Sequence, residues 1–425
     1  MKFRKVSALL LAGAMCAATV VGCGKTSSST SGTGSNDATK AAEDEEITAT
    51  ITVWGPAEDQ SADNGEWLQN MCKKFNDEHP KWNLTFKYGT CSEGDAGKTV
   101  SADPSASADV YMFANDQLQT LIDAGAISKL GGSALETVKK NNSEAMLNTV
   151  TIGDDVYGVP FTGNTWFLYY NKDIFTADDV KNLDTMLSKG KVSFKLTDSW
   201  YIGGFYIGNG CTVFGADGKD EKAGVDLTGD KATDVTKYLV DLAANPNFVN
   251  DADQSGITGF NDGTIGAFFS GTWDKSNIKL DKSKVGVVAA PTYTLNGKEN
   301  QMTAFAGSKS IGVNPNCKYP QVAVALALYL GSDEAQISHY ESRGIIPCNT
   351  GAVSNDKVAA DEMAVAQNDV MNNKSVMQPT CKGMSNWWTP AENMGKSIIA
   401  GETTKDNAAD KTAEFNEGAN NGVVK

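Results

Sequence analysis

The residue types that usually perform catalysis or hold metals are sparse in this chain of 425 residues. It contains only two histidines, His79 and His339, so a zinc site with three histidine ligands cannot form. A catalytic triad that depends on histidine has the same two candidates. Residues 251–256 (DADQSG) begin like a calcium-binding loop, but Asp262 stands where such a loop has a glutamate. The sequence therefore predicts no metal and no cofactor.

The overall charge excludes other classes of partner. Lysine and arginine number 37 and aspartate and glutamate 52, which gives a formal net charge of −15. Binding to nucleic acid or to an anionic lipid surface requires a basic face, so neither is expected. No apolar segment after residue 23 approaches the roughly 20 residues that cross a membrane. The body of the chain is therefore not expected to span a membrane.

The N-terminus predicts export. Residues 1–22 combine a basic start with a short apolar run, which is typical of a secretory signal peptide. The run ends in VVGC at residues 20–23, which resembles the lipobox of bacterial lipoproteins and implies a lipid anchor on Cys23, outside the cytoplasm. A plain signal peptide with an incidental cysteine is the alternative. Residues 23–46 are rich in serine, threonine, glycine and acids, so we expect a disordered tether there.

Six cysteines follow the tether, and they do not form a Cys-x-x-Cys metal or redox motif. An even number in a secreted chain permits disulfides, and nearness in sequence favours Cys72 with Cys91 as one pair. Free buried thiols are the alternative. The six residues are Cys72, Cys91, Cys211, Cys317, Cys348 and Cys381.

Strand and helix patterns alternate along the rest of the chain. Residues 47–54 (ITATITVW) alternate and are β-branched, which predicts a strand, and residues 66–78 have the spacing of an amphipathic helix. Residues 110–113 form a short apolar run that favours a buried strand, and residues 321–330 favour a core helix. This alternation predicts an α/β protein.

Five segments, in this order, resemble the carbohydrate-binding group of extracellular solute-binding proteins of ABC transporters, the group that includes maltose-binding protein. The resemblance runs from about residue 47 to the end. It implies a two-lobed, periplasmic-binding-protein-like (type II) α/β fold with a hinge and a ligand cleft between the lobes. Lobe 1 would comprise residues 47–162 and 306–356, and lobe 2 residues 163–305 and 357–425. The segments are residues 108–130, 154–175, 260–278, 341–353 and 384–404.

A cleft for a sugar needs two kinds of side chain. Hydroxyl groups require hydrogen-bond partners, and the C–H faces of the ring pack on aromatic rings. The resemblance places both kinds in loops after strands, although Phe113 replaces a tryptophan and Asn164 an acid of the maltose-type pattern. The expected ligand-binding residues are Glu58, Asp59, Phe113, Asn115, Asp116, Asn164, Trp166, Asp198, Trp200, Trp273, Trp387 and Trp388.

The resemblance implies a lipid-anchored binding protein that delivers a carbohydrate, such as a maltodextrin-like oligosaccharide, to the permease subunits of an ABC importer, without catalysis. The same scaffold could bind a polyamine, an amino-acid derivative or a peptide. A secreted glycosidase would instead need two carboxylates about 5–10 Å apart, for which Asp198 and Glu58 are the candidates. A surface adhesin or sensor with this fold is a fourth reading.

Overall fold

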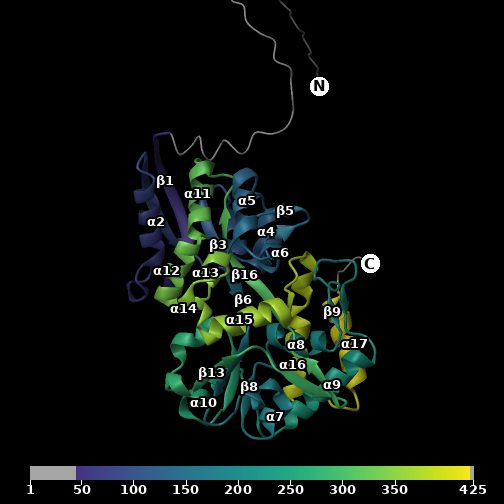
Figure 1. Ribbon diagram of the computed structural model, residues 1–425. Coiled ribbons are helices and arrows are strands. Elements are labelled where there is room, and N and C mark those ends of the chain that lie inside the picture. The colour runs from purple at the N-terminus through teal and green to yellow at the C-terminus, as the bar shows by residue number, and fades with distance from the viewer. Residues whose placement is uncertain (1–44, 422–425) are drawn as a thin grey trace, which may run out of the picture. The chain divides into compact units, whose positions relative to one another are not determined.

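Two mixed β-sheets and their covering helices make up residues 45–421, the part of the chain that the computed structural model describes (Figure 1). The predicted signal peptide, Cys23 and nearly all of the predicted tether lie outside these residues. Among the helices of residues 45–421, none combines the length and the apolar character that a bilayer crossing needs.

The first sheet starts from the predicted strand at residue 47. Every second side chain of that strand is buried, as its alternating sequence predicts, and it pairs in parallel with both of its neighbours. The strand order is β17 (Ser375–Met377), β16 (Ala304–Val313), β3 (Val110–Ala114), β1 (Ile47–Gly55) and β2 (Trp82–Thr90), with β6 (Val159–Asn164) also paired to β16.

The second sheet is built from shorter and more apolar strands, most of whose residues are buried. Its central strands β8 and β12 run parallel, and β7 is antiparallel to both of its neighbours. The order is β11 (Phe248–Asn250), β8 (Val192–Phe194), β12 (Ala267–Ser270), β7 (Phe167–Asn171) and β13 (Val285–Val288). Three small hairpins complete the strands: β4 (Thr151–Ile152) with β5 (Asp155–Val156), β9 (Thr212–Val213) with β10 (Val225–Asp226), and β14 (Thr292–Leu295) with β15 (Lys298–Gln301).

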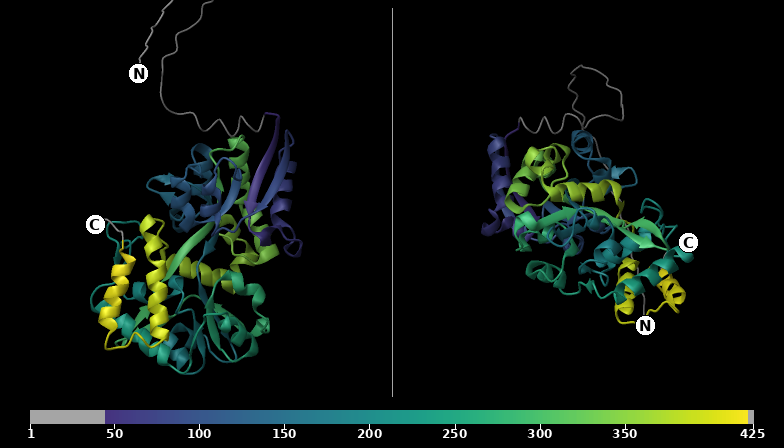
Figure 2. Two further views of the ribbon diagram at one scale, coloured as in Figure 1. Left: turned by 180° about the vertical axis from the view of Figure 1, so that it is seen from behind. Right: turned by 60° about the horizontal axis from the view of Figure 1, so that its bottom comes forward.

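Helices cover both sheets with their apolar faces. In the predicted helix at residue 67 the buried side chains recur at helical spacing, and they contribute to the core of the first sheet. Around the first sheet are α2 (Trp67–Glu78), α3 (Ala96–Ala102), α4 (Leu118–Asp123), α5 (Gly132–Asn141), α6 (Glu144–Asn148), α11 (Pro320–Leu330) and α12 (Asp333–Arg343). The other α-helices are α7 (Leu183–Leu187), α8 (Ser199–Gly208), α9 (Asp230–Ala244), α10 (Ser255–Asp262), α13 (Thr350–Val353), α14 (Asp356–Ala359), α15 (Glu362–Asn373), α16 (Trp388–Ile399) and α17 (Ala408–Ala419), the last two of which pack side by side (Figure 2).

The apolar side chains form two separate cores, one for each sheet, and the chain passes between them more than once. Phe161 belongs to the first core and Trp166 to the second, so one passage lies at the end of β6. Along β16, Phe305 belongs to the second core and Ile311 to the first. The chain therefore passes from one core to the other within β16 as well. The limits of the lobes stay a prediction.

The predicted disulfide between Cys72 and Cys91 is wrong, because all six cysteines of residues 45–421 are free thiols. Cys72 lies on the buried face of α2, where it contributes to the first core. Burial raises the pKa of its thiol to about 12. Closeness in sequence does not bring two Cβ atoms to the spacing that a disulfide requires.

Candidate functional site

The predicted polar and aromatic residues follow the carboxyl ends of parallel strands in both sheets. In the first sheet, β1 leads into η1 (Ala57–Gln60) with Glu58 and Asp59, and β3 leads into η3 (Asn115–Gln117). In the second sheet, β12 leads into η5 (Thr272–Asn277) with Trp273. In open α/β sheets this end of the strands is where ligands bind.

A cavity of about 410 Å³, which we call the Trp273 cavity, is lined by residues from both sides. η1 contributes Glu58 and Asp59, the end of β6 contributes Asn164, and η5 contributes Trp273. These residues come from segments that pack with different cores, so the cavity lies between the two sheets' bodies. It brings four of the predicted site residues together.

Trp273 offers an open aromatic surface in this cavity. Its side chain is 39% exposed, although large apolar residues are usually buried. Gly271 makes its position possible, because a Cβ atom at that residue would lie only 2.1 Å from the indole ring. The ring of Trp200 lies 6.0 Å away between centroids, at an angle of 48°. The Trp273 ring, with Trp200 packed beside it, offers an aromatic surface of the kind on which the C–H face of a sugar packs.

The charged groups of the Trp273 cavity are largely paired. Asp59 is 1% exposed, and its Oδ1 atom lies 2.8 Å from Nε2 of His339 and 2.6 Å from Nη1 of Arg343. Burial alone would raise the pKa of the Asp59 carboxyl, but His339 and Arg343 outweigh it and hold that pKa below its usual value. Glu93 pairs with Lys309 at 3.3 Å.

A second cavity of about 480 Å³, which we call the Trp388 cavity, is lined by residues of α3, η3 and α4 and by residues 379–388. It contains the predicted residues Asp116 and Trp388. Burial raises the pKa of Asp116, whose carboxylate accepts a hydrogen bond from Gln117 at 3.1 Å. Asp123 and Lys382 form an ion pair at 2.7 Å between α4 and η7 (Lys382–Asn386).

Comparison with known proteins identifies the family. The sequence model of a family described as bacterial extracellular solute-binding protein matches residues 70–366. The chain belongs to this family. The resemblance predicted from the sequence is therefore confirmed.

Among the curated relatives is a maltooligosaccharide ABC transporter solute-binding lipoprotein of Streptococcus pneumoniae serotype 4. It is 27% identical over 429 residues, which cover 96% of this chain and 95% of the relative.

Solved structures confirm the two-lobed α/β fold. One, determined with acarbose, is 51% identical, covers 89% of this chain and 100% of its own, and superposes with a TM-score of 0.84. A maltodextrin-binding protein from L. casei BL23, solved without ligand, is 25% identical, covers 88% of this chain and 99% of its own, and has a TM-score of 0.80.

Three of the predicted binding residues are not available to a ligand in this solute-binding protein. Phe113, Trp166 and Trp387 are each fully buried, with 0% exposure, and they pack in the two hydrophobic cores. The indole N–H of Trp387 donates to the backbone oxygen of Ser199 at 2.9 Å. We therefore leave these three residues out of the candidate site, because sequence position alone does not tell a core aromatic residue from one that lines a cleft.

Two further predicted residues have clear structural roles. Asn115 is 1% exposed, and its Oδ1 accepts the backbone N–H of Ser308 at 3.0 Å. Asp198 is the N-cap of α8 and accepts the backbone N–H of Trp200 at 2.8 Å. Burial raises the pKa of Asp198. Neither residue lines the Trp273 or the Trp388 cavity.

Several charged residues line the cleft cavities but were missed by the sequence analysis. Arg343, His339, Lys309 and Glu93 line the Trp273 cavity, and Lys382 lines the Trp388 cavity. Arg343 could have been singled out, because it lies within one of the family-like segments, beside Gly344. Its partner Asp59 is 284 residues away in the chain, so no local signal joins them.

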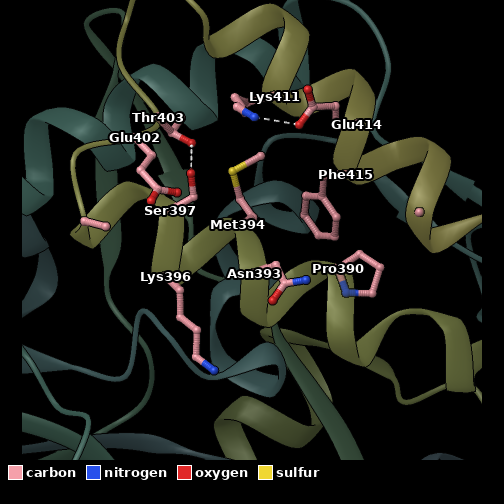
Figure 3. A pocket seen from close by; sticks show the side chains of 12 residues that line it. Pro390, Asn393, Met394, Lys396, Ser397, Glu402, Thr403, Lys411, Glu414 and Phe415 are labelled. Carbon is pink, nitrogen blue, oxygen red and sulfur yellow. Dashed lines mark hydrogen bonds and ion pairs between the residues drawn. The ribbon is translucent and has the colours of Figure 1, made fainter.

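Another cavity, of about 530 Å³, lies between α16 and α17 and is shown in Figure 3. Met394 and Phe415 line it together with polar groups, among them the Lys411–Glu414 ion pair. Not one of the twelve predicted binding residues lines this cavity. The candidate binding site of this solute-binding protein is therefore the pair of cavities that carry Trp273 and Trp388.

Proposed function

We propose that this protein binds a maltooligosaccharide in the Trp273 and Trp388 cavities and delivers it to the membrane subunits of an ABC importer. Two observations support the choice of ligand. The cavities combine half-exposed tryptophans with polar groups, the mixture that a sugar requires. The similar structure determined with acarbose and the S. pneumoniae maltooligosaccharide-binding relative point to the same chemistry.

The balance of charge in the two cavities is the observation that favours a neutral ligand. Five carboxylates line the two cavities, and three of them, Asp59, Glu93 and Asp123, pair with a base that lines the same cavity. A polycation would have to compete with these pairs for the carboxylates. A neutral ligand with many hydroxyl groups can use the remaining donors and acceptors without breaking any pair. This favours a carbohydrate over a polyamine.

The remaining parts of the proposal concern where the protein acts. A lipid on Cys23 would hold the protein on the outer face of the cytoplasmic membrane, and residues 23–46 would be the tether. The protein would act as a monomer and would release its ligand unchanged, since the family consists of binding proteins.

The test measures the binding of a defined panel of ligands to the purified protein by calorimetry and by thermal melting. Maltopentaose and acarbose are the expected ligands, and cellopentaose is the matched control because it contains the same sugar in a different linkage. A ligand at a hundredfold excess over its Kd should stabilise the folded protein by about 2.7 kcal/mol. Binding of spermidine but not of maltopentaose would refute the proposal, and so would the appearance of shorter sugars after long incubation.

A further inference from the structure

Trp200 does not line either cavity, but it has neighbours beside both of them. It is half-buried, lies in the first turn of α8, and packs beside Trp273 of the Trp273 cavity. Its indole Nε1–H donates a hydrogen bond to Oε1 of Gln378, with the two atoms 2.8 Å apart. Gln378 is only 5% exposed. The amide is therefore a fixed acceptor that selects the orientation of the Trp200 ring.

Gln378 is itself attached to the strand shared by the two cores. It follows β17 directly, and its backbone N–H donates to the oxygen of Ala306 in β16 at 2.8 Å. The next residues, Pro379 and Thr380, line the Trp388 cavity. Gln378 thus bonds to β16 through its backbone and to the Trp200 ring through its side chain. It also directly precedes two residues of the Trp388 cavity wall.

We propose that Gln378 is a positioning residue that orients Trp200 against Trp273, so that the Trp200 ring supports the Trp273 ring on which the ligand packs. The proposal rests on the proposed function, since it assigns the surface to a sugar. Asp198 caps α8 and fixes the backbone at Trp200, but the backbone alone does not choose among the rotamers of the half-buried Trp200 side chain. Without the Gln378 acceptor, the indole N–H of Trp200 would have to turn towards water, which would move the ring away from Trp273.

The experiment compares two substitutions of one side chain. Gln378→Met keeps the length and removes the acceptor, whereas Gln378→Glu keeps an oxygen in the same place. We expect Gln378→Met to raise the Kd for maltopentaose about three- to tenfold, the range for one lost hydrogen bond, and Gln378→Glu to stay within about twofold. In the ligand-free protein, the ¹H–¹⁵N resonance of the Trp200 indole should move upfield in Gln378→Met and remain in place in Gln378→Glu.

A double-mutant cycle separates positioning from a general loss of stability. Trp200→Phe removes the donor, so Gln378→Met should cause no further loss of affinity in that background. An unchanged indole resonance in Gln378→Met would overturn the proposal, and so would an equal loss of affinity with and without Trp200. Should Gln378→Met not fold, Gln378→Asn replaces it, because it withdraws the amide by one methylene. The same changes in Kd and in the indole resonance are then expected.

The two proposals can fail separately. If the unaltered protein does not bind maltopentaose, the proposed function fails, and the indole resonance alone decides whether Gln378 orients Trp200. If the protein binds maltopentaose but the resonance is unchanged in Gln378→Met, only the positioning role fails.

Discussion

The sharpest prediction concerns Trp273→Ala, because the exposed part of this side chain is the surface on which the ligand is proposed to pack. A tryptophan carries up to about 250 Å² of surface, of which 39% is open at Trp273. A sugar face that covers most of that open surface removes roughly 80 Å² from water. At about 25 cal/mol per Å², the contact contributes about 2 kcal/mol. The Kd for maltopentaose should therefore rise about thirtyfold.

The assay is titration calorimetry with maltopentaose, together with a thermal melt that shows each variant to be folded at the assay temperature. Tyr88→Ala is the matched control, because Tyr88 is 37% exposed but lies on the outer strand β2 and does not line either cleft cavity. Its Kd should equal that of the unaltered protein. An unaltered Kd in Trp273→Ala, with a normal melt, would refute the assignment of this ring to the binding surface.

Three other predictions follow from the charges and thiols. Asp59→Asn should lower the free energy of unfolding by about 3–5 kcal/mol in a denaturant titration, because it leaves Arg343 partly buried without its carboxylate. Since the folded pKa of Asp59 lies below its unfolded value near 3.9, its stabilisation is present above about pH 4 and is lost as the pH falls through the folded pKa. The melting temperature of Asp59→Asn should hence decrease less steeply below pH 4 than that of the unaltered protein. Lys382→Ala should change the Kd by less than about threefold, since its pair with Asp123 is exposed; a tenfold change would show that this ion pair controls closure. All six cysteines of residues 45–421 should be alkylated in the unfolded protein without reductant, as mass spectrometry would show, and a protected pair would contradict the free thiols.

Local sequence predicted most of the elements that carry the site. The alternation of residues 47–54 and the apolar run 110–113 became β1 and β3, and the helical spacing after residue 66 became α2, because each pattern suits one geometry. β16 was not predicted, although it is ten residues long and pairs with β3, β6 and β17. Nine of its ten residues are buried, on both faces of the strand, so its sequence lacks the alternation that marks a half-buried strand.

The candidate site likewise contains residues that the sequence predicted and residues that it did not. A strand pattern already implies that Glu58, Asp59 and Trp273 stand just after strand ends, where ligands bind in α/β sheets. Their meeting in one cavity was not implied, because β1 and β12 belong to different sheets. The charges that neutralise these acids could not be predicted, since Asp59 and Arg343 are 284 residues apart. Only the folded chain brings them within 2.6 Å.

Sequence by itself determined the class of fold, the family and the kinds of side chain that the cleft would use, because these depend on local patterns and on the order of segments. Tertiary structure decided which of those side chains a ligand can reach. Trp387 and Trp388 are neighbours, yet Trp387 is fully buried in the second core and Trp388 lines a cavity. Successive residues at a helix start point about 100° apart, and only the packing of α16 against the second core fixes which one faces inward.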